Sequence, residues 1–318
     1  MSIGDAIASN DFFAACVLPS EFDAERKCIS FQLTEENDYR TKEGIRLDLS
    51  PFAPYTKNNS QPATSQQNHE AIVNAALAAI ESSIVEKVVV SCIKHAPRNT
   101  TNLDTYFHRL CDCYPNAFVY ILNHPKHGIW MGATPELLLH KQGSQFRTVS
   151  LAGTQPFLEI ESIVWSDKLK HEQELVTDFI TEKLSNIQAS DIQFNGPYSA
   201  QAGPLAHLKT DIQFQSQVST REIIDALQPT PAVCGLPREE ALAFIQQHAD
   251  FDRRLYAGRI GLHHPSGDEI HFVNLRCMQV FEDHFELHVG GGIVAGSIAA
   301  DEWRETEIKA DVLRAIIQ

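Results

Sequence analysis

Basic residues are scarce in this chain of 318 residues, in which 26 Lys and Arg stand against 41 Asp and Glu, a formal net charge of −15. A protein that binds nucleic acid needs a cationic face, and one held on anionic lipid needs a basic patch. We therefore expect no nucleic-acid partner and no membrane partner. A small anionic substrate is still compatible, because a few cations, backbone N–H groups or a metal reverse the field at one site.

Paired cysteine motifs are also missing. The seven cysteines are scattered and have no CxxC spacing, so neither a disulfide framework nor a structural zinc site is indicated. No apolar run reaches the roughly 20 residues that span a bilayer. The first 15 residues carry Asp5 and Asp11 and no basic segment typical of a signal peptide. We expect a cytoplasmic protein.

Hydrophobic periodicity predicts strands separated by helices without regular βαβ alternation, which indicates an α+β fold. A polar loop at 56–70 divides a short N-terminal portion, residues 1–66, from the main body, 67–318. Strands are expected at 84–93, 117–123, 129–133, 137–140, 146–151, 254–263, 269–281 and 284–289. Helices are expected at 71–80, 161–187, 221–227, 239–247 and from 300 to the C-terminus.

Lys87 and Glu136 are candidates for proton transfer. Lys87 lies in the β-branched run 85–90 (VEKVVV), where burial favours the neutral amine that a general base needs. Glu136 follows a Gly-Ala-Thr-Pro turn and precedes three leucines, a setting that raises a carboxyl pKa and suits a general acid. Taken alone, each residue also fits an ordinary role, as a lysine that snorkels to water and as a solvated turn carboxylate.

Carboxylates on two of the predicted helices are candidates for metal binding. Glu172 and Glu174 lie in the long helix, and Glu302, Glu305 and Lys309 share a face of the last helix. Mg²⁺ usually takes one or two protein carboxylates and keeps several waters. On a lone helix, Glu305 and Lys309 fit a surface ion pair equally well.

The run Gly290-Gly291-Gly292 and Arg276 are candidates for holding an anion. Without Cβ atoms, the backbone approaches a ligand closely and offers N–H groups, although a tight turn would use glycines as well. Arg276 is a candidate carboxylate fork, or one half of a structural salt bridge. Together, these candidates indicate metal-assisted chemistry on a small polyanion: two acids that bind a metal, one general base, one general acid and two groups that bind an anion.

The order of these segments resembles the chorismate-utilising enzymes, a family that includes isochorismate, salicylate, anthranilate and aminodeoxychorismate synthases. The matching motifs span most of residues 70–318. In chain order they are 87–91 (KVVVS), 132–138 (GATPELL), 151–154 (LAGT), 170–176 (KHEQELV), 207–210 (HLKT), 229–235 (PTPAVCG), 256–258 (YAG), 275–276 (LR), 290–294 (GGGIV) and 302–309 (EWRETEIK).

The resemblance implies two stacked, mostly antiparallel β-sheets flanked by helices, with the active site in a cleft between them. It implies a monomer, with Mg²⁺ held by Glu172 and Glu305 against the ring carboxylate of chorismate. It also implies that Lys87 is the base and Glu136 the acid. Further positions match the family's substrate contacts, namely Gly153, Thr154, His207, Ala232, Tyr256, Arg276, Gly291, Gly292 and Lys309.

Two positions separate the reactions of this family. Ala152 stands where aminodeoxychorismate synthases carry a nucleophilic lysine, and Lys87 stands where ammonia-using anthranilate synthases lack one. The resemblance therefore implies an isochorismate synthase, in which Lys87 deprotonates the water that attacks ring carbon 2 and Glu136 protonates the departing 4-hydroxyl. A salicylate synthase, which goes on to expel pyruvate, uses the same lysine and is the first alternative.

A catalytically inactive chorismate-binding homologue is the second alternative. It is motivated by four departures from residues that are usual in the family. These departures are Cys92, Leu169, Gln173 and Gln228.

Overall fold

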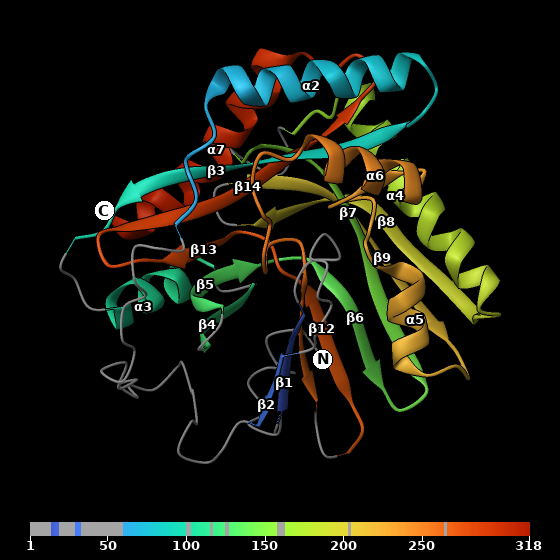
Figure 1. The fold of residues 1–318 in the computed structure, drawn as a ribbon. Coiled ribbons are helices and arrows are strands. Elements are labelled where there is room, and N and C mark those ends of the chain that lie inside the picture. Colours follow the sequence, from blue (N-terminus) through green and yellow to red (C-terminus); the bar gives the residue numbers. More distant parts are fainter. Residues whose placement is uncertain are drawn as a thin grey trace.

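Two antiparallel β-sheets, flanked by helices, form the protein (Figure 1). The computed structural model describes residues 14–18, 29–32, 60–99, 103–114, 117–124, 127–157, 163–202, 205–263 and 266–318. The α+β architecture predicted from the sequence is confirmed. No helix in these ranges is long and apolar enough to cross a membrane.

The larger sheet has eight strands in the order β2-β1-β11-β12-β6-β7-β9-β8. Neighbouring strands are antiparallel throughout. Their bounds are β1 (Ala14–Leu18), β2 (Ile29–Gln32), β6 (Leu137–Gln142), β7 (Gln145–Pro156), β8 (Ser190–Ala202), β9 (Leu205–Gln215), β11 (Arg259–His263) and β12 (Glu269–Val273). Because β1 pairs with β11, the N-terminal portion contributes strands to the same sheet as the main body.

The smaller sheet has six strands in the order β10-β3-β14-β13-β5-β4, again antiparallel. Their bounds are β3 (Lys87–Pro97), β4 (Phe118–His124), β5 (Gly128–Thr134), β10 (Gly235–Leu236), β13 (Cys277–Val280) and β14 (His284–Val294). The first eight residues of β3 are buried, which explains why that strand reads as an almost continuous apolar run.

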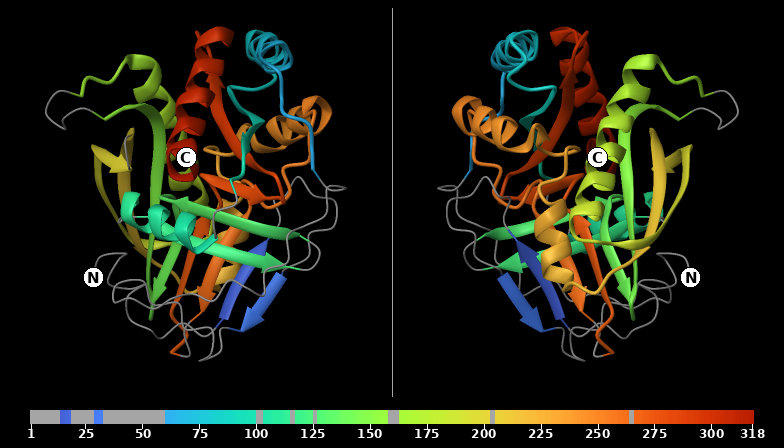
Figure 2. Two further views of the ribbon diagram at one scale, coloured as in Figure 1. Left: turned by 90° about the vertical axis from the view of Figure 1, so that its left-hand side faces the viewer. Right: turned by 90° about the vertical axis from the view of Figure 1, so that its right-hand side faces the viewer.

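Six helices cover the described sheets. They are α2 (Gln66–Glu81), α3 (Leu103–Cys113), α4 (Asp167–Asn186), α5 (Thr220–Leu227), α6 (Arg238–His248) and α7 (Ala299–Ile317). Helix α4 packs on β7 and β9 of the larger sheet, whereas α2, α6 and α7 pack on the smaller sheet. Figure 2 shows α7 (red) between α2 (blue) and α4 (yellow-green), so the last helix faces both neighbours.

Serine N-caps explain where three of these helices begin. Ser65, Ser166 and Ser219 each accept a hydrogen bond from a backbone N–H of the first turn. The predicted loop 56–70 was therefore wrong from Gln66 onward, because Ser65 starts a helix inside the polar segment. Residues 163–166, predicted as helix, are not helical, because Ser166 is the N-cap of the helix that begins at Asp167.

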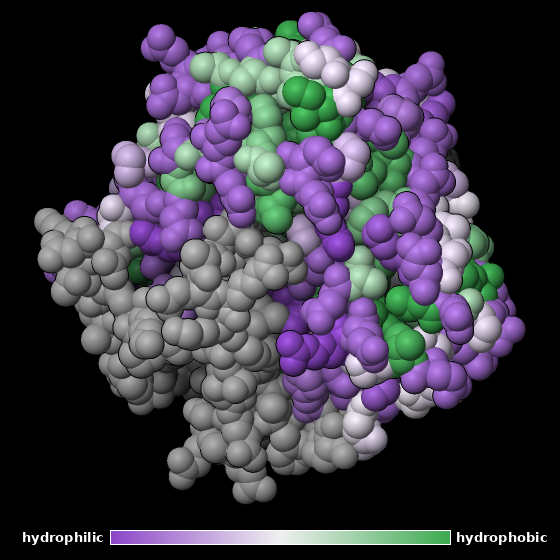
Figure 3. All heavy atoms as spheres, turned by 45° about the vertical axis from the view of Figure 1, so that its right-hand side comes forward, coloured by the Kyte–Doolittle hydropathy of each residue, from purple (hydrophilic) through white to green (hydrophobic). Residues whose placement is uncertain are grey.

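The sequence analysis placed no strand between residues 190 and 215, where the structure has β8 and β9. It also predicted one strand over 269–281, which the structure divides between the two sheets as β12 and β13. The predicted strand at 254–263 begins only at Arg259. Hydrophilic residues dominate the face in Figure 3, with separated hydrophobic groups between them, as is normal for a protein surface.

Candidate active site

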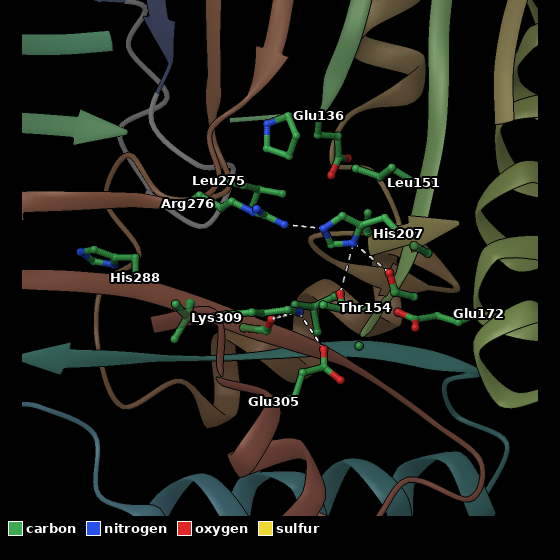
Figure 4. Close-up of a pocket in the computed structure, with 18 of the residues that line it drawn as sticks. Glu136, Leu151, Thr154, Glu172, His207, Leu275, Arg276, His288, Glu305 and Lys309 are labelled. Atoms are coloured by element: carbon green, nitrogen blue, oxygen red, sulfur yellow. Dashed lines mark hydrogen bonds and ion pairs between the residues drawn. The ribbon is translucent and has the colours of Figure 1, made fainter. Parts of the chain in front are cut away.

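A pocket lies where the two sheets meet, lined by β3 and β14 of the smaller sheet and by β7 and β9 of the larger one (Figure 4). Most residues predicted for the site line it, namely Glu136, Gly153, Thr154, Glu172, His207, Ala232, Tyr256, Arg276, Gly292, Glu305 and Lys309. Lys87 and Gly291 do not line it, but both lie against its carboxylates.

Two neighbouring crossings between the sheets carry Glu136 and Arg276. The chain passes from β5 to β6 at Glu136, and from β12 to β13 just before Arg276. The crossings are tied together by the hydrogen bonds Val273 N–H to Glu136 O, 3.0 Å, and Ala133 N–H to Arg276 O, 3.1 Å. The acid and the arginine therefore enter the pocket from adjacent loops.

Glu136 is only 5% exposed. Burial raises the pKa of its carboxyl to about 7, and the nearby Lys87 charge and a hydrogen bond from Thr230 oppose the rise only in part. Near neutral pH a large share of this carboxyl is protonated, which is the form that donates a proton.

Lys87 is fully buried and does not reach water as a snorkelling lysine would, and its Nζ lies 2.9 Å from Glu172 Oε1. The pair joins the first residue of β3 to helix α4. Burial alone would raise the Glu172 pKa, but Lys87 and two further lysines hold it below its usual value, so the carboxylate is ionised.

The glycine run fits the close-approach interpretation. A Cβ on Gly292 would lie 2.3 Å from Glu172 Oε1 and 2.8 Å from the Lys87 Cε. A Cβ on Gly291 would meet carboxylate oxygens of Glu302 and Glu305 at 3.3 and 3.6 Å. The missing Cβ atoms let β14 pass directly against the acidic side chains of α4 and α7.

Glu302 is among the carboxylates that the sequence indicates as candidates for metal binding, although the resemblance implies only Glu172 and Glu305 as ligands. It is 2% exposed, and Lys168 Nζ lies 2.6 Å from its Oε1. Its Oε2 has no hydrogen-bond partner of normal geometry within the described ranges. Burial lowers the Lys168 pKa, but Glu302, Glu305 and Glu172 together raise it, so all three carboxylates act on this lysine.

These acids fit a hard divalent cation. Glu172 and Glu305 both line the pocket, Glu302 adds an unpartnered buried oxygen, and two glycines leave room beside them. Oxygen-only donors of this kind suit Mg²⁺.

His207 connects Arg276 to the larger sheet. Its Nδ1 lies 2.8 Å from Gly153 O and 3.3 Å from Thr154 Oγ1, and its Nε2 contacts the Arg276 guanidinium. Since a carbonyl only accepts, Nδ1 carries the proton and Nε2 accepts from arginine. Burial and the Arg276 charge hold the His207 pKa well below its usual value, in agreement with this neutral form.

Three of the residues that depart from the family pattern pack against the rest of the protein and away from the pocket. The Gln173 Nε2 lies 3.2 Å from the hydroxyl of Ser150 and 2.9 Å from those of Thr177 and Thr210, so it ties α4 to the larger sheet. Leu169 belongs to a small apolar cluster with Trp165. Cys92 is fully buried, and burial raises its thiol pKa to about 11. None of these side chains lines the pocket.

Comparisons with known proteins agree with this geometry. The family model described as chorismate binding enzyme matches residues 15–318. Isochorismate synthase EntC of Escherichia coli (strain K12) is 31% identical over 265 residues, which cover 80% of this chain and 68% of that protein. Isochorismate synthase DhbC of Bacillus subtilis (strain 168) is 32% identical over 198 residues, 58% of this chain and half of that protein.

A solved structure has the same fold over nearly the whole chain. It is described as the putative 2,3-dihydroxybenzoate-specific isochorismate synthase DhbC from Bacillus anthracis. The TM-score is 0.78 at 25% identity, with 96% of this chain and 84% of that chain covered. The sequence motifs, the two-sheet fold, the pocket and these matches lead to one conclusion: the chain belongs to the chorismate-binding enzyme family.

Proposed function

We propose that this protein is an isochorismate synthase, which converts chorismate to isochorismate by adding water at ring carbon 2 with loss of the 4-hydroxyl. The proposal is carried by two buried groups, the amine of Lys87, which lies 2.9 Å from the pocket residue Glu172, and the carboxyl of Glu136, which lines the pocket and has a raised pKa. The reaction needs both a base and an acid. The names of both curated relatives agree with this activity.

We propose Arg276, Lys309 and the backbone of Gly291 and Gly292 as the grip on the enolpyruvyl carboxylate. Arg276 is held by His207, by a hydrogen bond from its Nη1 to Ala202 O, 2.9 Å, and by the Tyr114 hydroxyl, so its guanidinium is oriented at the pocket. The Lys309 Nζ lies 2.8 Å from Gly290 O and therefore sits at the glycine run. Gly153, Thr154, Ala232 and Tyr256 shape the remaining walls.

Glu172 and Glu305 are the proposed Mg²⁺ ligands, with Glu302 beside them. When bound, the ion would supply positive charge that holds the ring carboxylate. Lys87 would then accept a proton from the attacking water. Glu136, which Figure 4 shows on the side of the pocket away from Glu305, would donate its proton to the departing hydroxyl.

Product analysis tests the proposal. The protein is incubated with chorismate and Mg²⁺, and the products are separated and identified, with EDTA-treated protein as the control. Isochorismate without pyruvate is the expected result. Salicylate and pyruvate in equal amounts would replace the proposal by a salicylate synthase. Failure to consume chorismate at saturating substrate and metal would exclude any synthase activity.

A further inference from the structure

Asn274 is a fully buried residue at the crossing from β12 to β13, and it uses both backbone and side chain to join three segments. Its backbone N–H donates to Gly258 O, and its carbonyl accepts from Ala257 N, both at 2.9 Å. Its Nδ2 donates to Leu255 O at 2.7 Å, and its Oδ1 accepts from the Tyr120 hydroxyl at 2.6 Å. The loop 255–258 is thus held to the crossing, and the crossing to strand β4.

Elementary chemistry fixes the direction of each of these bonds. The Leu255 carbonyl can only accept, so the amide nitrogen of Asn274 faces it. The amide oxygen then faces Tyr120, whose hydroxyl donates. Burial raises the Tyr120 pKa well above its usual value, so the hydroxyl keeps the proton that it donates. Phe in place of Tyr120 would leave the amide oxygen buried and unpartnered.

The segments that Asn274 joins carry two pocket residues, Tyr256 and Arg276. Both segments adopt backbone conformations that non-glycine residues avoid: Ala257 has φ +62° and Arg276 has φ +47°. Such conformations cost about 1–3 kcal/mol each and persist only where the surroundings enforce them. Asn274 bonds to Ala257 directly and lies two residues before Arg276, so it is placed to enforce both.

We propose that the Tyr120–Asn274 hydrogen bond is a positioning device for the reaction, which holds Arg276 and Tyr256 at the geometry that the substrate needs. The inference rests on the isochorismate synthase function proposed above. Neither Tyr120 nor Asn274 lines the pocket, so both act through the residues that they hold. The bond ties β4 of the smaller sheet to the segment in which the chain passes from β12 of the larger sheet to β13 of the smaller one.

Tyr120→Phe is the sharpest test, because it removes one oxygen and keeps the ring. We expect kcat/KM for chorismate to fall about 10- to 100-fold, since a shift of about 1 Å in a positioning group costs up to about 100-fold in rate. At saturating chorismate, the Mg²⁺ concentration for half-maximal activity should not change, because Glu172 and Glu305 lie on α4 and α7, away from this network. A smaller fraction of folded protein would lower the apparent kcat but leave KM unchanged, so a change in KM shows that the substitution acts on the folded site.

Tyr106→Phe is the matched control. Tyr106 is 1% exposed, and its hydroxyl has no hydrogen-bond partner in the described part of the chain, so its loss should leave kcat/KM within twofold. The double variant Tyr120→Phe, Asn274→Ala should be no worse than Asn274→Ala alone, because the hydroxyl acts through that amide. Additive losses would contradict the proposal.

Calorimetric chorismate binding with Mg²⁺ present separates the two proposals. Weaker chorismate binding by Tyr120→Phe than by the wild-type protein supports the positioning role. If the wild-type protein binds chorismate but produces no isochorismate, only the proposed isochorismate synthase function is rejected. Wild-type turnover with equal kcat/KM and equal binding in Tyr120→Phe would reject only the positioning role. A wild-type protein that neither binds nor converts chorismate would reject both.

Discussion

Replacing Glu136 with Gln should make the protein more stable at alkaline pH and nearly inactive. Gln keeps the size of the side chain and can still accept the hydrogen bond that Thr230 donates, Oγ1 to Oε1, 3.4 Å. It cannot ionise, and it cannot deliver the proton that the departing hydroxyl needs. The same substitution therefore removes a destabilising charge and a catalytic group.

The size of the stability gain follows from the Glu136 pKa, which rises from 4.5 to about 7. Each pKa unit corresponds to about 1.4 kcal/mol, so the ionised form costs the folded state about 3 kcal/mol. The folded state binds more protons than the unfolded state between pH 4.5 and about 7, so stability contributed by this group falls as pH rises through that window. Glu136→Gln should gain about 3 kcal/mol at pH 8 and less than about 1 kcal/mol at pH 5.

Urea unfolding at pH 5 and pH 8 measures the gain, and steady-state kinetics measure the loss. We expect kcat to fall by at least about 100-fold, the usual contribution of a general acid, and wild-type kcat to decline above about pH 7 as Glu136 ionises. Glu174→Gln, on the exposed face of α4, is the matched control and should change neither quantity. An equal stability gain at both pH values would refute the raised pKa, and normal turnover would remove Glu136 as the acid.

Three further substitutions test other parts of the site. Gly292→Ala places a Cβ 2.3 Å from Glu172 Oε1 and should abolish Mg²⁺-dependent activity. Gly291→Ala, with contacts of at least 3.3 Å, should cost less than tenfold in kcat/KM. Equal losses in the two variants would contradict the close approach of β14 to Glu172. Lys87→Ala should abolish turnover and leave Mg²⁺-dependent chorismate binding by calorimetry nearly intact, and normal rates would remove Lys87 as the base. Burial lowers the His288 pKa to about 3, so the stability contributed by this group should fall as pH drops below 6.5. His288→Phe should therefore gain about 2 kcal/mol at pH 5 relative to pH 8 in urea unfolding, and no difference between the two pH values would exclude the effect.

Local patterns predicted most elements but not those whose stability comes from distant partners. Helix α4 has a clear helical periodicity and strand β3 has a continuous apolar run, and both were predicted from the sequence. Strand β8 is largely exposed and contains Gly196 and Pro197, so nothing in its own sequence favours a strand. It forms because β9 pairs with it, and that pairing is not visible in a local window. The division of 269–281 between two sheets depends on the same kind of long-range partner.

Family motifs predicted which residues gather at the pocket, whereas their contacts depended on the fold. Nothing in the sequence joins Lys87 to Glu172, because they meet only where β3 passes helix α4. The Tyr120–Asn274 bond spans 154 positions and likewise depends on how the two sheets meet. Glu302 was a candidate from its position on the last helix, but its burial and its unpartnered oxygen are tertiary properties.

The charges of the site explain how an acidic protein would accept a dianion. Three lysines and three glutamates form separate pairs with a net charge of zero, and Arg276 adds one positive charge, so chorismate and Mg²⁺ bring opposite charges into a largely buried site that is nearly balanced. Entry of both keeps the balance, and each ligand should therefore tighten the other by the same factor, about 5- to 150-fold. Calorimetric titration of chorismate with and without Mg²⁺ measures this factor; equal affinities would show that the pairs do not set the charge balance. The pairs are Lys87–Glu172, Lys168–Glu302 and Lys309–Glu305, at 2.9, 2.6 and 2.7 Å.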